Sequence, residues 1–297
     1  MQRRVRPNDL EWARGLRTSA ETQDIWWVCD DYEIRGGKVV ARYPATSFGD
    51  GKYYPIPDYA RYEGWRSYRP LQETPDLFLR FARLYQELDF DNAALVWSRK
   101  YGVPGGISST KIPSGHRPDF MSIKGFWEEV KKARFILRMY EAALNRDPPA
   151  VQALLADYRN EGANYLWSMG INEESPFGYY ENELQFALYG AIKLVKTEVE
   201  RLCDEWLVVE GDQRIPDPSR VRLVQGFRNL LGAMYLQMYW LMSSGGDAAR
   251  CEHCSQLMSL ARPHPEGRKR RRDKRFCDDA CRQAHHRSKK RSADGPS

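Results

Sequence analysis

Apolar side chains recur at intervals of three and four residues through most of the chain between residues 74 and 242. This spacing places them on one face of an α-helix, and that face packs against the rest of the protein. The pattern predicts helices over about 74–88, 91–102, 122–145, 179–209 and 219–242. We therefore predict a mainly α-helical body.

Residues that start and stop helices support these assignments. Thr74 is predicted to cap the first helix, with Pro75 in its first turn, and Asp91 to cap the second. Gly102 is predicted to end the second helix. The longest helix has an apolar face made of Ile123, Trp127, Val130, Leu137, Tyr140 and Leu144.

The last two predicted helices are also amphipathic. Trp206 continues the apolar face of the helix over 179–209, and Val221 begins that of the helix over 219–242. The most apolar run, Leu230 to Met242, has 13 residues, which is too short to cross a bilayer. We interpret it as a central core helix.

One segment near the N-terminus has a different pattern. Residues 25–43, IWWVCDDYEIRGGKVVARY, favour a β-hairpin that turns at Gly36 and Gly37. A two-residue turn there predicts three cross-strand pairs: Ile34 with Val39, Tyr32 with Ala41, and Asp31 with Arg42. Residues 44–70 are predicted to form an ordered loop. The body, residues 1–242, is thus expected to be helical with one small N-terminal hairpin.

The charge is distributed unevenly along the 297 residues. The net charge is +6, but the first 250 residues contain 33 Lys and Arg against 34 Asp and Glu. From Cys251 onward there are 13 basic residues against 6 acidic ones. A neutral body with a basic tail favours a polyanionic partner for the tail. The N-terminus lacks the apolar core of a secretory signal, so we expect a cytoplasmic protein without a membrane partner.

Four of the six cysteines lie in that tail. Cys251 and Cys254 form a C-x2-C pair, and Cys277 and Cys281 form a C-x3-C pair after 22 intervening residues. In a reducing compartment, pairs at this spacing favour one structural Zn²⁺ ion over disulfides. The alternatives are unrelated pairs in a disordered tail, a redox site, or a site for another metal. His285, one helical turn beyond Cys281, is an alternative ligand.

The tail is therefore predicted to form a small zinc finger of the treble-clef type. The finger would span residues 251–291 and end in a basic helix, with a flexible linker over 243–250 and a disordered tail over 292–297. His253, inside the first cysteine pair, is expected to point outward. The other two cysteines, Cys29 and Cys203, are predicted to be ordinary buried thiols.

Basic residues flank the second cysteine pair on both sides. They predict contacts with nucleic-acid phosphates, whose counterions are released on binding. A solvated charge run or a targeting signal is the alternative. The candidate contacts are Arg268, Lys269, Arg270, Arg271, Arg272, Lys274, Arg275, Arg282, Arg287, Lys289 and Lys290.

The pattern C-x2-C … RFC-x3-CR-x-A resembles the CGNR-type zinc finger of bacterial stress-linked regulators. The resemblance is confined to the segment from Cys251 onward, and CRQA stands at Cys281–Ala284 in place of the tetrapeptide that names the family. It implies that the four cysteines are zinc ligands, that a largely helical domain precedes the finger, and that the protein is a DNA-binding transcription regulator.

The body offers little catalytic chemistry. Its first 250 residues contain one histidine, His116, and none of the P-loop, H-E-x-x-H or G-x-S-x-G motifs. Ser108 and Lys111 form an isolated S-x-x-K. We therefore lean against an enzyme. The leading hypothesis is a zinc-dependent DNA-binding regulator, with DNA favoured over RNA, whose body senses a signal or partner or forms a homodimer. A nuclease or toxin-like effector, and a protein-interaction module without catalysis, are the alternatives.

Overall fold

The computed structural model describes residues 26–42, 65–105, 120–160, 181–209, 221–227, 229–243, 248–260 and 274–293. His116, Ser108 and Lys111 lie outside these ranges, as do the basic residues 268–272. The described part is mostly helical, with several small antiparallel sheets. This confirms the predicted mainly α-helical class.

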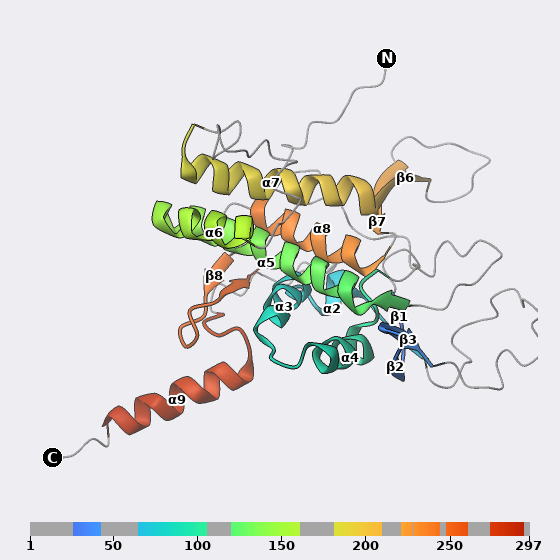
Figure 1. Cartoon of the computed structure of the whole chain (residues 1–297), viewed down its shortest axis with the longest axis horizontal. Helices are drawn as coiled ribbons and strands as arrows, with labels where there is room; N and C mark the ends of the chain where they lie inside the picture. Colours follow the sequence, from blue (N-terminus) through green and yellow to red (C-terminus); the bar gives the residue numbers. More distant parts are fainter. Residues whose placement is uncertain are drawn as a thin grey trace, which may run out of the picture.

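The helical body is shown in Figure 1. Its helices are α2 (Pro70–Glu73), α3 (Leu77–Arg83), the 3-10 helix η3 (Leu84–Gln86), α4 (Phe90–Tyr101), α5 (Ile123–Asn145), α6 (Pro148–Asn160), α7 (Glu183–Leu202) and α8 (Leu230–Ser243). None of the helices in the described ranges combines the length and the apolarity needed to cross a membrane.

Helix α8 forms the centre of the core. All of its side chains from Leu230 to Met238 are buried, as the apolar run predicted. It packs against α7, α3 and α2, and α5 packs against both α7 and α3. Gln237 is the one polar residue in this buried run. Its amide nitrogen donates to the carbonyl oxygens of Pro70 (2.9 Å) and Thr74 (2.7 Å), and its Oε1 accepts from the N–H of Phe78 (3.3 Å).

The prediction that Thr74 caps the first long helix, α3, is wrong. The helix begins at Leu77, with Asp76 rather than Thr74 as N-cap residue, and the Asp76 side chain makes no capping bond. Gln237 instead satisfies an N–H group of the first turn, and no local sequence pattern shows this. At α4 the capping residue is Asp89 rather than Asp91, and its carboxylate accepts from the N–H of Asn92.

Other helix predictions hold with smaller changes. Gly102 ends α4 with a φ of 89°, and α5 covers the predicted range. Most of the predicted face of α5 is buried or half-buried, but Leu144 is exposed. Helix α6 was not predicted.

The prediction of continuous helices over 179–209 and 219–242 is wrong for part of each segment. Helix α7 ends at Leu202 and is followed by strand β6 (Cys203–Val209), which pairs with β7 (Val221–Phe227) before α8 begins. Trp206 pairs with Val224 in this ladder. Valine and tryptophan suit strands better than helices, and pairing with a distant partner decided the outcome.

The N-terminal hairpin is confirmed over a shorter range than 25–43. Strands β2 (Tyr32–Arg35) and β3 (Lys38–Ala41) pair in the predicted register, with Asp31 and Arg42 bonded beyond their ends. Gly36 (φ 57°) and Gly37 (φ 69°) adopt the left-handed conformations that a type I′ turn requires. β5 (Phe120–Ser122) adds a third strand beside β3. The preceding strand β1 (Trp26–Cys29) pairs instead with β4 (Trp65–Tyr68), inside the segment predicted as loop.

The C-terminal part contains another antiparallel pair of strands and one helix. Strand β8 (Ala248–Arg250) pairs with β9 (Leu257–Ser259), and helix α9 covers Asp279–Ala293. Residues 248–250 of the predicted linker are therefore a strand of this hairpin. Helix α9 includes the first two residues of the predicted tail, 292–297. In Figure 1, α9 extends away from the helical body.

Candidate metal centre

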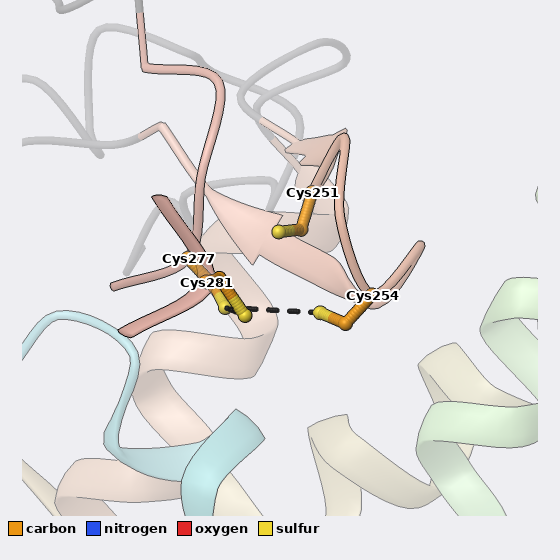
Figure 2. Close-up of side chains that lie close together, drawn as sticks. All are labelled: Cys251, Cys254, Cys277 and Cys281. Atoms are coloured by element: carbon orange, nitrogen blue, oxygen red, sulfur yellow. Dashed lines mark hydrogen bonds between the residues drawn. The ribbon is translucent and has the colours of Figure 1, made fainter. Parts of the chain in front are cut away.

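The four tail cysteines lie together at the base of α9. Their sulfur atoms all lie within 4.8 Å of one another. The Sγ atoms of Cys254 and Cys277 are 3.8 Å apart, and those of Cys277 and Cys281 are 3.3 Å apart (Figure 2). A tetrahedral site with metal–sulfur bonds of about 2.3 Å needs sulfurs about 3.8 Å apart. The group could therefore hold one metal ion.

The first cysteine pair lies on the loop between β8 and β9. The N–H of Cys251 donates to the carbonyl of Gln256 (3.0 Å), and the N–H of Ser255 donates to the carbonyl of Cys251 (2.9 Å). Ser255 takes a left-handed conformation with φ of 57°, which closes the turn after Cys254. The strand pairing of Arg250 with Leu257 fixes both ends of this loop.

The second pair lies at the N-terminus of α9. The Asp278 carboxylate accepts from the N–H of Cys281 at 2.7 Å, as an N-cap residue does. This bond holds the pKa of Asp278 below its ordinary value. Cys277 precedes the helix and Cys281 lies in its first turn, so a single capped turn supplies two sulfurs, as the sequence predicted.

The pKa values of Cys251, Cys277 and Cys281 are shifted in different directions. Burial opposes ionisation of Cys251, but the backbone N–H groups of Cys254, Cys277 and His253 lower the pKa of Cys251 to about 6. Burial, together with hydrogen bonding to Cys281, raises the pKa of Cys277 well above its ordinary value. Although the hydrogen bond from Cys277 acts in the opposite direction, burial and the other thiols raise the pKa of Cys281 to about 11. A divalent cation would reverse these upward shifts, so binding one here releases protons.

An ion pair joins the two halves of the site. Both carboxylate oxygens of Glu252 accept from the guanidinium group of Arg275, through Nε and one terminal nitrogen. The N–H of Glu252 also donates to the carbonyl of Arg275 at 2.9 Å. The hydrogen bond from Arg275 lowers the pKa of Glu252, and the pKa of Arg275 is raised in turn.

The first half of the site is anchored on the helical body. Leu257 and Met258 in β9 are each 2% exposed, and Leu257 belongs to the main hydrophobic core. Arg83 of α3 donates to the carbonyl of Leu257 at 2.6 Å. Arg250 donates to the Asn145 side chain of α5 at 2.8 Å. The hairpin is thus packed on the body.

Neither His285 nor His253 is among the ligand atoms that lie together. His285, predicted as an alternative ligand, instead packs its ring 5.1 Å from that of Phe276. His285 lies one helical turn beyond Cys281, and at this position its ring contacts Phe276. His253 is exposed, as predicted.

The described basic residues are distributed around α9. Arg275, Arg282, Arg287 and Lys289 are exposed, and Lys274 is half-exposed. Arg282 forms an ion pair with Asp279 at 3.0 Å, within the first turn of the helix. Lys290 lies in α9, and the remaining predicted contacts, 268–272, lie outside the described residues.

Sequence reasoning missed the contacts that hold this centre in place. It treated Arg275 only as a phosphate contact, although Glu252 directly follows Cys251 and Arg275 closely precedes Cys277. Opposite charges beside the two cysteine pairs were a usable signal for the pairing. The packing of Leu257 against the body had no such signal.

Comparison of the chain with models of known protein families, with curated proteins and with solved structures gives no match.

Proposed function

We propose that the protein is a zinc-dependent DNA-binding protein, a transcription regulator of the CGNR-type class that its finger resembles. One Zn²⁺ ion held by Cys251, Cys254, Cys277 and Cys281 would fix α9 against the β8–β9 hairpin. The helical body would sense a signal or a partner. The observation that carries the proposal is the gathering of four sulfurs at the base of an exposed basic helix.

The composition of α9 supports a polyanionic partner. After Asp279 the helix contains no acidic residue up to its end at Ala293, and it contains Arg282, Arg287, Lys289, Lys290 and Arg291. Helix α9 is about 22 Å long and extends away from the body in Figure 1. The major groove of duplex DNA admits a helix of this kind.

The test is binding of the full-length protein to duplex DNA across a salt series, measured by fluorescence anisotropy. With about five phosphate contacts, the logarithm of the association constant should fall with the logarithm of salt concentration at a slope of about −4.5. Changing both Arg287→Gln and Lys289→Gln should reduce the slope by roughly two. Lys196→Gln, which removes an exposed charge on α7, is the control and should leave the slope unchanged.

Chelation of the metal should weaken DNA binding, and RNA of equal length should bind less tightly. Binding that ignores chelator, salt and the α9 substitutions would contradict the proposal. Degradation of the nucleic acid during the assay would favour the nuclease alternative.

A further inference from the structure

The two halves of the metal centre are connected by a contact that needs no metal. Cys251 and Cys254 belong to the hairpin on the body, whereas Cys277 and Cys281 belong to α9. Between them, in the described part of the chain, lies the bidentate ion pair of Glu252 with Arg275. We propose that this pair, here called the latch, positions the two cysteine pairs for metal binding, and that Arg275 is a positioning residue rather than a phosphate contact. This rests on the metal-binding part of the proposed function, not on DNA binding.

The placement of the latch explains how it acts. Glu252 follows Cys251 directly, and Arg275 lies two residues before Cys277. The guanidinium fork and the carboxylate meet through two parallel bonds, which fix orientation as well as distance. The bond from the N–H of Glu252 to the carbonyl of Arg275 aligns the two backbones beside the sulfurs. Together these three bonds set how the α9 half approaches the hairpin half.

The same geometry separates Arg275 from the other basic residues of the tail. Its Nε and one terminal nitrogen already donate to the two carboxylate oxygens of Glu252, and the negative charge of that carboxylate opposes the approach of a phosphate to the same guanidinium group. Arg287, by contrast, donates only to the carbonyl of Gln283, one helical turn earlier, among the contacts the structure gives it. Arg287 is therefore the matched comparison: an exposed arginine of the same finger, outside the latch.

The experiment measures zinc affinity of the full-length protein by competition with a chromophoric chelator. The variants are Glu252→Gln, Arg275→Gln and the exchange that combines Glu252→Arg with Arg275→Glu. Each single variant should weaken zinc binding by about three- to tenfold, because partners outside the ligand shell orient the ligands. The exchange should recover wild-type affinity to within about twofold. Arg287→Gln should leave zinc affinity unchanged.

The direction in which each single variant shifts zinc affinity distinguishes the latch from a simple effect of charge. Acting through space alone, loss of the positive Arg275 and loss of the negative Glu252 would shift zinc affinity in opposite directions. Loss of the latch shifts both in the same direction. Opposite shifts, or an exchange variant that stays as weak as the single variants, would overturn the proposal.

Three further results would also overturn it, and they differ in what they say about the proposed function. If the wild-type protein binds zinc and both single variants bind it equally well, the latch has no positioning role while the metal centre stands. If Arg275→Gln leaves zinc affinity intact but lowers the salt dependence of DNA binding as Arg287→Gln does, Arg275 is a phosphate contact. A wild-type protein that takes up no zinc removes both the metal centre and the latch.

Discussion

Leu257 is the residue at which the metal centre and the body meet. It lies three residues after Cys254, in the strand that closes the cysteine loop, and its side chain is part of the main core. Its carbonyl accepts from Arg83. A single residue thus contributes to the core through its side chain and fixes the cysteine loop through its backbone.

Replacing Leu257 by alanine should therefore destabilise the whole protein. We expect Leu257→Ala to lower the free energy of unfolding by about 2–4 kcal/mol, because it leaves a cavity in a packed core. Leu88→Ala is the matched control, since Leu88 is fully exposed. Chemical denaturation of both variants, followed by circular dichroism, checks this. Equal stability of the two variants would show that the hairpin is not packed on the body.

At this scale, the sequence predicted the residues whose chemistry is local. The four cysteines were recognised by their spacing, and Gly36, Gly37 and Gly102 by the turns they permit. Gln237 and Leu257 were not recognised for their roles, because their partners are far away in sequence. Only the fold brings such residues together.

Helix α9 depends on the metal centre more than any other element of the described chain. Its described side chains are exposed except for Cys281, Ala284 and His285, which are half-buried. A helix of about 15 residues is marginal in water without tertiary packing. The β8–β9 hairpin, in contrast, is packed on the body through Leu257 and Met258.

Removing the metal should release α9 and leave the hairpin in place. On addition of chelator, we expect the amides of 279–293 to exchange with solvent much faster, while those of β8, β9 and α8 keep their protection. Hydrogen exchange followed by mass spectrometry of the full-length protein measures this. Simultaneous loss of protection in the hairpin and α9, or unchanged exchange in α9, would show that the order of α9 does not depend on the metal as described.

Long helices were the elements that the sequence predicted best. The apolar pattern of α5 predicted its full range, and the continuous apolar run from Leu230 to Met242 predicted α8. The strands β6 and β7 were taken for helix ends because a few apolar residues satisfy either period. Their pairing across the intervening residues decided between the two. Strand β1 was assigned to the hairpin because it directly precedes β2 in the sequence. Its partner is the more distant strand β4.

Across the whole molecule, the neutral body and the basic tail have separate tasks in the proposed function. The body packs against the hairpin that carries half of the metal centre, and the tail supplies the charge. The sequence predicted the neutral body and the basic, cysteine-containing tail from the distribution of charge and cysteines, but it did not predict that the metal centre is partly built on the body. It identified no signal or partner for the body, because the periodic apolar residues that specify a helical core carry no information about a ligand.

The central claim is that four thiolates of this chain hold one zinc ion. X-ray absorption at the zinc edge, combined with metal analysis of the full-length protein, tests it most directly. We predict one zinc per chain with four sulfur neighbours at about 2.3 Å, and loss of the metal in Cys254→Ser. A protein that takes up no zinc, or zinc surrounded by nitrogen and oxygen at about 2.0–2.1 Å, would contradict it.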